Sequence, residues 1–141
     1  MSVLKSKRGE STMQFLETAR KLEIYTIKQC AKFPKRFTFL ITNDLVALAK
    51  GVYNGVKAAN SIYPTNAAEA QLRKNYIITA NCDLQCLISQ LDIAREFIYN
   101  TDANKPIRDR VWQVWLNLIT EEAKLLSALK NSDKERYKNL I

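Results

Sequence analysis

The sequence predicts an all-α fold, an antiparallel four-helix bundle, on three observations. Glycine and proline are scarce, with three of each in 141 residues. Apolar residues recur at steps of three and four, whereas the alternation typical of strands is rare. Three proline-containing breaks divide the chain into four long helical patterns. Because the connections are short, neighbouring helices should run up-down-up-down in a single domain, residues 1–141.

The first helical pattern spans about residues 12–33 and follows a basic N-terminal arm, residues 1–10. Ser11 or Thr12 can cap this helix at its start. Pro34 ends it, because proline lacks the N–H that a continuing helix needs.

The second pattern runs from about residue 35 to residue 63 and carries one apolar stripe. Gly51 and Gly55 lie inside it, although glycine costs about 1 kcal/mol of helix propensity relative to alanine. We therefore expect both glycines to mark the close approach of a neighbouring helix. The stripe comprises Ile41, Leu45, Leu48, Val52, Val56, Ala59 and Tyr63.

The third pattern spans about residues 67–99, after a break at Pro64 and a capping signature formed by Asn66 and Glu69. It has two apolar faces about 180° apart. The first is the seam expected to face the core and comprises Ile77, Ala80, Leu84, Leu87, Leu91, Ala94 and Ile98. The second, which we call the outer stripe, comprises Ile78, Cys82, Cys86, Ile93 and Phe97.

The outer stripe predicts self-association. A helix at the edge of a four-helix bundle needs only one apolar face, so a second face implies burial on both sides. In a protein of one domain, another subunit supplies that burial most simply. Two alternatives stay open: the helix is central in the bundle, or the terminal segments cover the stripe.

The fourth pattern spans about residues 106–131 and starts at Pro106, a favourable first helical position. The short tail, residues 132–141, has a capping signature of its own and either forms a fifth helix or extends the fourth. Trp112 and Trp115 are interpreted as bundle core, with a platform for stacking bases as the alternative.

The residue inventory argues against an enzyme and against a cofactor. There is no histidine, which removes the commonest general base and the commonest metal ligand. Glu121 and Glu122 point about 100° apart on a helix and are interpreted as surface residues. Cys82 and Cys86 would need two further ligands to hold zinc, so we interpret them as small apolar core residues. No catalytic residue, no metal and no cofactor is expected.

An odd number of cysteines, three, suggests free thiols in a reducing compartment. No apolar run is long enough to cross a bilayer, and the basic start lacks the apolar region of a signal peptide. We expect a cytoplasmic protein without membrane contact.

The net charge of +8 and the pI near 9.5 favour an anionic partner, with ordinary solubilising charge as the alternative. Several cations lie at helix N-termini, where they oppose the macrodipole, so helix stability does not explain them. The cations form three clusters along the chain: Lys28, Lys32, Lys35 and Arg36; Arg73 and Lys74; and Lys105, Arg108 and Arg110. In an up-down bundle the first and third clusters share one end, and the second lies toward the other. Such patches suit the phosphate backbone of RNA and DNA.

Several segments carry a resemblance to a known family. "KFPKRF", then "AANSIYPTN" and a long third helix, resemble the bacterial four-helix-bundle family. That family includes proteins encoded in 23S ribosomal RNA intervening sequences and the accessory variability determinants of diversity-generating retroelements. "MSVLKSKRGES", "MQFLETARKLEIYT" and "QCLISQLDIA" are similar to the retroelement branch. The matching turn residues are Phe33, Pro34 and Lys35, and at the second junction Ser61, Ile62 and Asn66.

The resemblance implies a barrel-like homopentamer with a basic surface. It implies binding to nucleic acid and to the reverse transcriptase of the same element, in support of mutagenic copying of template RNA into cDNA and its retrohoming. It implies no catalytic residue. The alternative is a standalone bundle of the intervening-sequence type with an unspecified interaction role, and a reverse transcriptase gene next door would separate the two.

Overall fold

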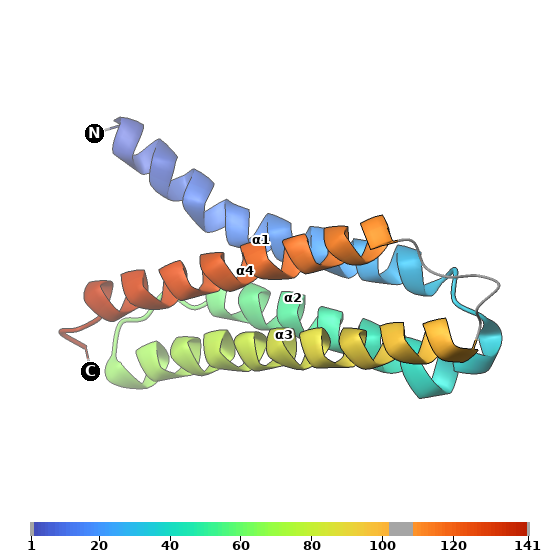
Figure 1. Ribbon diagram of the computed structural model, residues 1–141. Helices are drawn as coiled ribbons and strands as arrows, with labels where there is room; N and C mark the ends of the chain where they lie inside the picture. The colour runs from blue at the N-terminus through green and yellow to red at the C-terminus, as the bar shows by residue number, and fades with distance from the viewer. Residues whose placement is uncertain (1, 102–108, 141) are drawn as a thin grey trace.

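The computed structural model describes residues 2–101 and 109–140, with side chains described for 14–98 and 109–140. Its regular structure in these ranges is helical, with four long α-helices and no strand. The expected all-α fold is confirmed and is consistent with a four-helix bundle (Figure 1). The helices are α1, Ser2–Cys30; α2, Asn43–Asn60; α3, Ala67–Thr101; and α4, Asp109–Arg136.

Several helix bounds differ from those expected. Helix α1 begins at Ser2, so the expected arm is the first part of this helix from that residue on. Helix α2 is shorter than expected at both ends. A 3-10 turn and a π turn precede it, and it ends at Asn60, so Ser61 lies beyond it. Helix α4 continues through Arg136, so the expected tail mostly extends it. The expected start of this helix at residue 106 lies outside the described residues.

The helices pack side by side, except that the first part of α1 projects away from the other three (Figure 1). Helix α2 packs against α1 and α3, and α4 packs against α1 and α3. Figure 1 shows the connection from α1 to α2 and the start of α4 at one end of the molecule. The connection from α2 to α3 and the end of α4 lie at the other end. Residues far apart in the sequence therefore share an end.

A wide turn joins the proline corner to α2. Lys35–Phe37 form a 3-10 turn (η1), and Thr38–Thr42 form a π turn (η2). A π turn acts as one inserted residue, worth about 100° of rotation. On a regular helix, Phe37 and Leu45 would diverge by about 80°; with the insertion they diverge by about 20°. Both side chains are buried, so the π turn brings Phe37 into the core.

The two glycines of α2 lie where this helix crosses α3. A methyl group on Gly55 would lie 2.9 Å from the Cβ atom of Ala80 and 3.3 Å from the carbonyl oxygen of Tyr76. A methyl group on Gly51 would overlap the carboxylate of Asp83. The expected close approach of a neighbouring helix is confirmed.

The start of α3 carries the expected cap. The Glu69 N–H donates to the Asn66 side-chain oxygen at 2.9 Å. The Thr65 hydroxyl and N–H both donate to Glu69 Oε1, at 2.6 and 2.8 Å. These hydrogen bonds lower the pKa of the Glu69 carboxyl. The capping signature read from the sequence is confirmed.

The two tryptophans belong to the core. The Trp115 indole N–H donates to Thr26 Oγ1 at 2.9 Å, and Thr26 Oγ1 donates to the Leu22 carbonyl oxygen at 2.8 Å. Trp112 stacks on Trp115 with ring centroids 5.4 Å apart, and Tyr25 meets Trp115 edge-on at 5.7 Å. Both indoles are buried, which confirms the core interpretation over a base-stacking platform.

Glu122 corrects an expectation. It was expected on the surface, but its side chain is 0% exposed, and neither carboxylate oxygen has a hydrogen-bond partner among the described residues. Burial, with a smaller contribution from the charge of Glu121, raises the pKa of Glu122 to about 8. Loss of hydration penalises the charged form, so the carboxyl is mostly protonated near neutral pH.

The glycine contacts predict opposite outcomes for two similar substitutions. Gly55→Ala should lower the free energy of unfolding by about 1–2 kcal/mol, because the new methyl meets a Cβ atom and a carbonyl oxygen that cannot swing away. Gly51→Ala meets only the end of the flexible Asp83 side chain. It should be neutral or stabilising by up to about 1 kcal/mol, the gain in helix propensity. Urea unfolding of both variants tests this, and equal effects would contradict it.

Glu122 predicts a pH-dependent stability. Its carboxyl binds a proton more tightly in the folded chain than in the unfolded one, where the pKa is near 4.5. The free energy of unfolding should therefore fall as pH rises from about 4.5 to about 8 and level off above. Glu122→Gln should remove this decline and be more stable than wild type at alkaline pH, by on the order of a few kcal/mol. Glu121→Gln, the exposed neighbour, is the control and should keep most of it. Parallel pH profiles for wild type and Glu122→Gln would contradict the assignment.

Candidate nucleic-acid and subunit interfaces

Five of the expected cations lie at the end of the molecule where α1 meets η1 and α4 begins (Figure 1). All five side chains are exposed. No Asp or Glu occurs in the sequence between Glu23 and Asp44, which spans the whole corner. We call this group the basic end. It comprises Lys28, Lys32, Lys35, Arg36 and Arg110.

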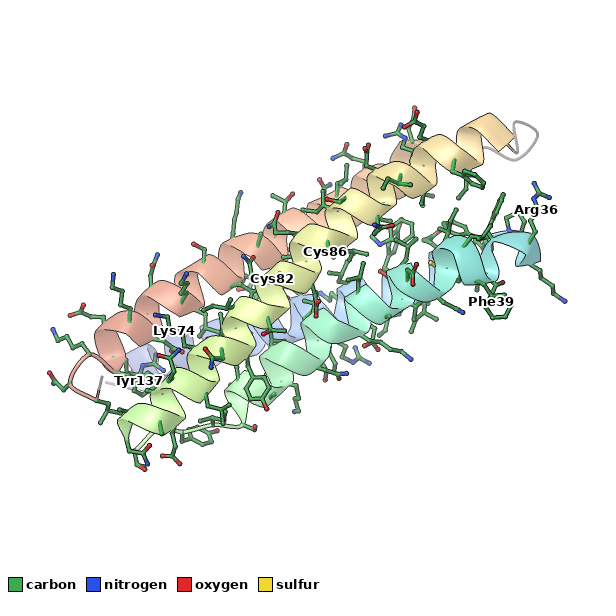
Figure 2. The ribbon with its side chains drawn as sticks, turned by 90° about the horizontal axis from the view of Figure 1, so that it is seen from below. Arg36, Phe39, Lys74, Cys82, Cys86 and Tyr137 are labelled. Atoms are coloured by element: carbon green, nitrogen blue, oxygen red, sulfur yellow. The ribbon has the colours of Figure 1, made fainter. Side chains whose placement is uncertain are left out.

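Arg36 lies on a supported aromatic pair. Its guanidinium carbon is 4.7 Å from the centroid of the Phe37 ring. Phe37 in turn meets Phe97 of α3 edge-on, with centroids 5.4 Å apart. A cation over a ring face gains about 0.5–1 kcal/mol at an exposed site, so Arg36 is held while its charge faces outward (Figure 2).

Arg110 lies beside α1. The Tyr25 hydroxyl donates to the Val111 carbonyl oxygen at 2.9 Å. Burial raises the pKa of Tyr25, and the positive charge of Arg110 partly opposes that shift. The first turn of α4 is therefore fastened to α1 one turn from Lys28, which brings cations of both helices to the same end.

The acidic group near the start of α4 is already engaged. Asp109 accepts a hydrogen bond from Arg95 of α3 at 2.8 Å. The positive charge of Arg95 balances the negative charge of Asp109, which would otherwise lower the positive potential of the basic end.

Arg73 has to be removed from the candidate phosphate contacts. Its side chain is buried, with the residue 4% exposed. The guanidinium donates to both carboxylate oxygens of Asp133, at 2.6 and 3.3 Å. It also donates to the carbonyl oxygens of Ala59 and Ile62, at 2.9 and 3.1 Å. Arg73 therefore ties the end of α2 and the start of α3 to the end of α4.

The remaining expected cations are divided. Lys74 is exposed, but it lies with Tyr137 at the end of the molecule opposite Arg36 (Figure 2). Lys105 and Arg108 lie outside the described residues. The structure thus places the five cations of the basic end at one end of the molecule and Lys74 at the other.

The outer stripe of α3 faces solvent in the single chain. All five residues are exposed, Ile93 most among its large side chains at 55%. Figure 2 shows Cys82 and Cys86 together on α3, away from α2. The core interpretation of these cysteines is therefore wrong for the single chain. Within the described residues no terminal segment buries the stripe, and α3 is not central.

Phe39 and Leu40 were missed by sequence reasoning. They are 86% and 68% exposed, beside the basic end. A signal was available, because a regular helix extended backward from Leu45 already places both residues off the apolar stripe. An exposed Phe–Leu pair next to lysines is a feature that core packing does not explain.

Comparisons with known proteins add no neighbour. No protein-family model matches the chain, and no curated protein and no solved structure matches it. No described helix is long and apolar enough to cross a membrane. Across residues 2–101 and 109–140, no group of three or more His, Cys, Asp or Glu side chains is placed to hold a metal ion.

Proposed function

We propose that this chain is a non-enzymatic nucleic-acid-binding subunit that accompanies the reverse transcriptase of a retroelement. The observation that carries the proposal is the basic end, a group of exposed cations contributed by α1, η1, the corner between them and α4. Exposed lysine and arginine suit phosphates, which carry affinity without reading sequence. The polymerase partner rests on the resemblance of "KFPKRF" and "AANSIYPTN" to the accessory variability determinants.

The proposed assembly is a closed homo-oligomer, a pentamer by the resemblance, of antiparallel up-down-up-down bundles. The exposed outer stripe supports it, because an apolar stripe along a helix is costly to leave in water. Rotational symmetry would repeat the basic end in every copy, so one nucleic acid could contact several copies at once. The proposed place of action is the cytoplasm, with template RNA and nascent cDNA as the nucleic acids.

The nucleic-acid proposal predicts the effect of reversing charge at the corner. Lys35→Glu with Arg36→Glu should weaken binding to RNA and DNA by on the order of tenfold or more at low salt. The fold should persist, because exposed charges contribute little to stability. Wild-type affinity should fall with salt, with a logarithmic slope of about −0.9 per duplex phosphate contacted. Fluorescence anisotropy measures both effects, and cDNA synthesis with the polymerase should fall in parallel.

The matched control is Lys50→Glu with Lys57→Glu, which makes the same charge change on exposed positions of α2. It should weaken binding much less. If both pairs behave alike, the effect is one of net charge and the basic end is not the site. Salt-independent binding, or copying at the wild-type level by the corner variant, would also count against the proposal.

The assembly proposal predicts that charge on the outer stripe gives monomers. Cys86→Glu with Ile93→Glu should dissociate the oligomer, because burying an unpaired carboxylate costs several kcal/mol. Gln85→Glu with Gln90→Glu changes exposed polar positions of the same helix and should leave the oligomer intact. Sedimentation velocity distinguishes the states. A wild-type chain that sediments as a stable monomer would end this part of the proposal.

A further inference from the structure

Phe39 is the most exposed large apolar side chain in the described part of the molecule, at 86%. Figure 2 shows it projecting from the same end of the bundle as Arg36. A phenylalanine in this position gains almost nothing from the core. Its hydration therefore costs free energy that the fold alone does not recover.

The π turn explains how the ring comes to stand outside. The Asn43 N–H reaches back to the Thr38 carbonyl oxygen, so the backbone widens between the corner and α2. This rotation directs Phe37 inward, against Phe97 and under Arg36. Phe39 is two residues further on and is directed away from the core. The segment from η1 into η2 therefore supplies one aromatic ring to the core and one to the surface.

The surroundings of Phe39 are cationic. Lys35 and Arg36 precede it by four and three residues in the chain, and Arg36 lies at the same end of the molecule as the ring (Figure 2). The nearest acidic residue along the chain is Asp44, beyond the π turn. Two adjacent cations suit the phosphates of a polyanion, and lysine is depleted from the buried parts of protein–protein interfaces.

We infer that Phe39 is a stacking platform for an unpaired base of single-stranded nucleic acid, with Lys35 and Arg36 on the neighbouring phosphates. This inference rests on the proposed function and assigns the form of its ligand. An exposed ring flanked by cations is the pattern by which proteins hold single strands without sequence preference. In a duplex the base faces are covered by their neighbours, so a duplex could use the cations but not the ring.

The test compares two probes on the full chain: a labelled oligothymidylate strand and a DNA duplex of the same length. Phe39→Ala should weaken binding of the single strand by about tenfold, within the range measured for one stacked base, and leave duplex binding within about twofold. Leu40→Ala removes an exposed apolar side chain from the same turn and is the matched control. It should change neither affinity, because Leu40 has no π-face to stack.

Phe39→Trp supplies a direct readout. It should keep single-strand affinity, and its indole emission should be quenched when the strand is added. The native Trp112 and Trp115 are buried, so the wild-type chain gives the background signal. Circular dichroism should show unchanged folding for all three variants, because Phe39 and Leu40 make little contact with the core.

The outcomes separate this inference from the function on which it rests. If the wild-type chain binds neither probe, the proposed function fails. If it binds both and Phe39→Ala changes neither, the proposed function stands and the stacking role is wrong. Equal losses on both probes would show that the ring only positions the cations. A loss of reverse transcriptase capture with single-strand affinity unchanged would assign Phe39 to a protein contact and overturn the inference.

Discussion

The close crossing of α2 and α3 is the constraint on which the rest of the structure depends. Gly55 lets the α2 backbone approach Ala80 and Tyr76 of α3, and no other residue would fit that space without displacing one helix. Because α3 is held so tightly on that side, the opposite side of the same helix is turned outward. The packing of one face of α3 against α2 thus leaves the opposite face, the outer stripe, exposed. The α2–α3 contact also fixes which residues share an end of the molecule.

The two ends of the molecule are built on different electrostatic principles. At one end, Arg73 and Asp133 neutralise each other in a buried site, and the remaining donors of the guanidinium satisfy helix-terminal carbonyl oxygens. Such a pair is costly to break, because either partner alone would be a buried charge. At the other end, the cations are exposed and the corner contributes no carboxylate. The same residue types therefore hold the fold together at one end and lie on the exposed surface at the other.

Sequence periodicity predicted the features that depend on local pattern. The four helices, the core seam of α3, the Asn66 cap and the glycine contacts all follow from spacing or from the properties of one residue type. It did not predict the role of Arg73, because its partner Asp133 is 60 positions away and only the packing of α3 on α4 brings them together. The burial of Glu122 was missed because it follows Glu121 directly, and both carboxylates were interpreted as surface charges. The π turn inserts one residue into the regular helical pattern, and no residue type in the sequence predicts where such an insertion occurs.

The placement of the cations gives any assembly built by rotation alone a direction. A cyclic group contains no operation that exchanges the two ends of a subunit. Unless the bundles lie perpendicular to the symmetry axis, every copy would present its basic end to the same side. One face of the particle would then contain the basic ends, and the other face would contain the Arg73–Asp133 ion pairs and the C-terminal turns. If the basic ends bind nucleic acid as proposed, the strand would meet them all on one side, which would leave the far side open to a second partner.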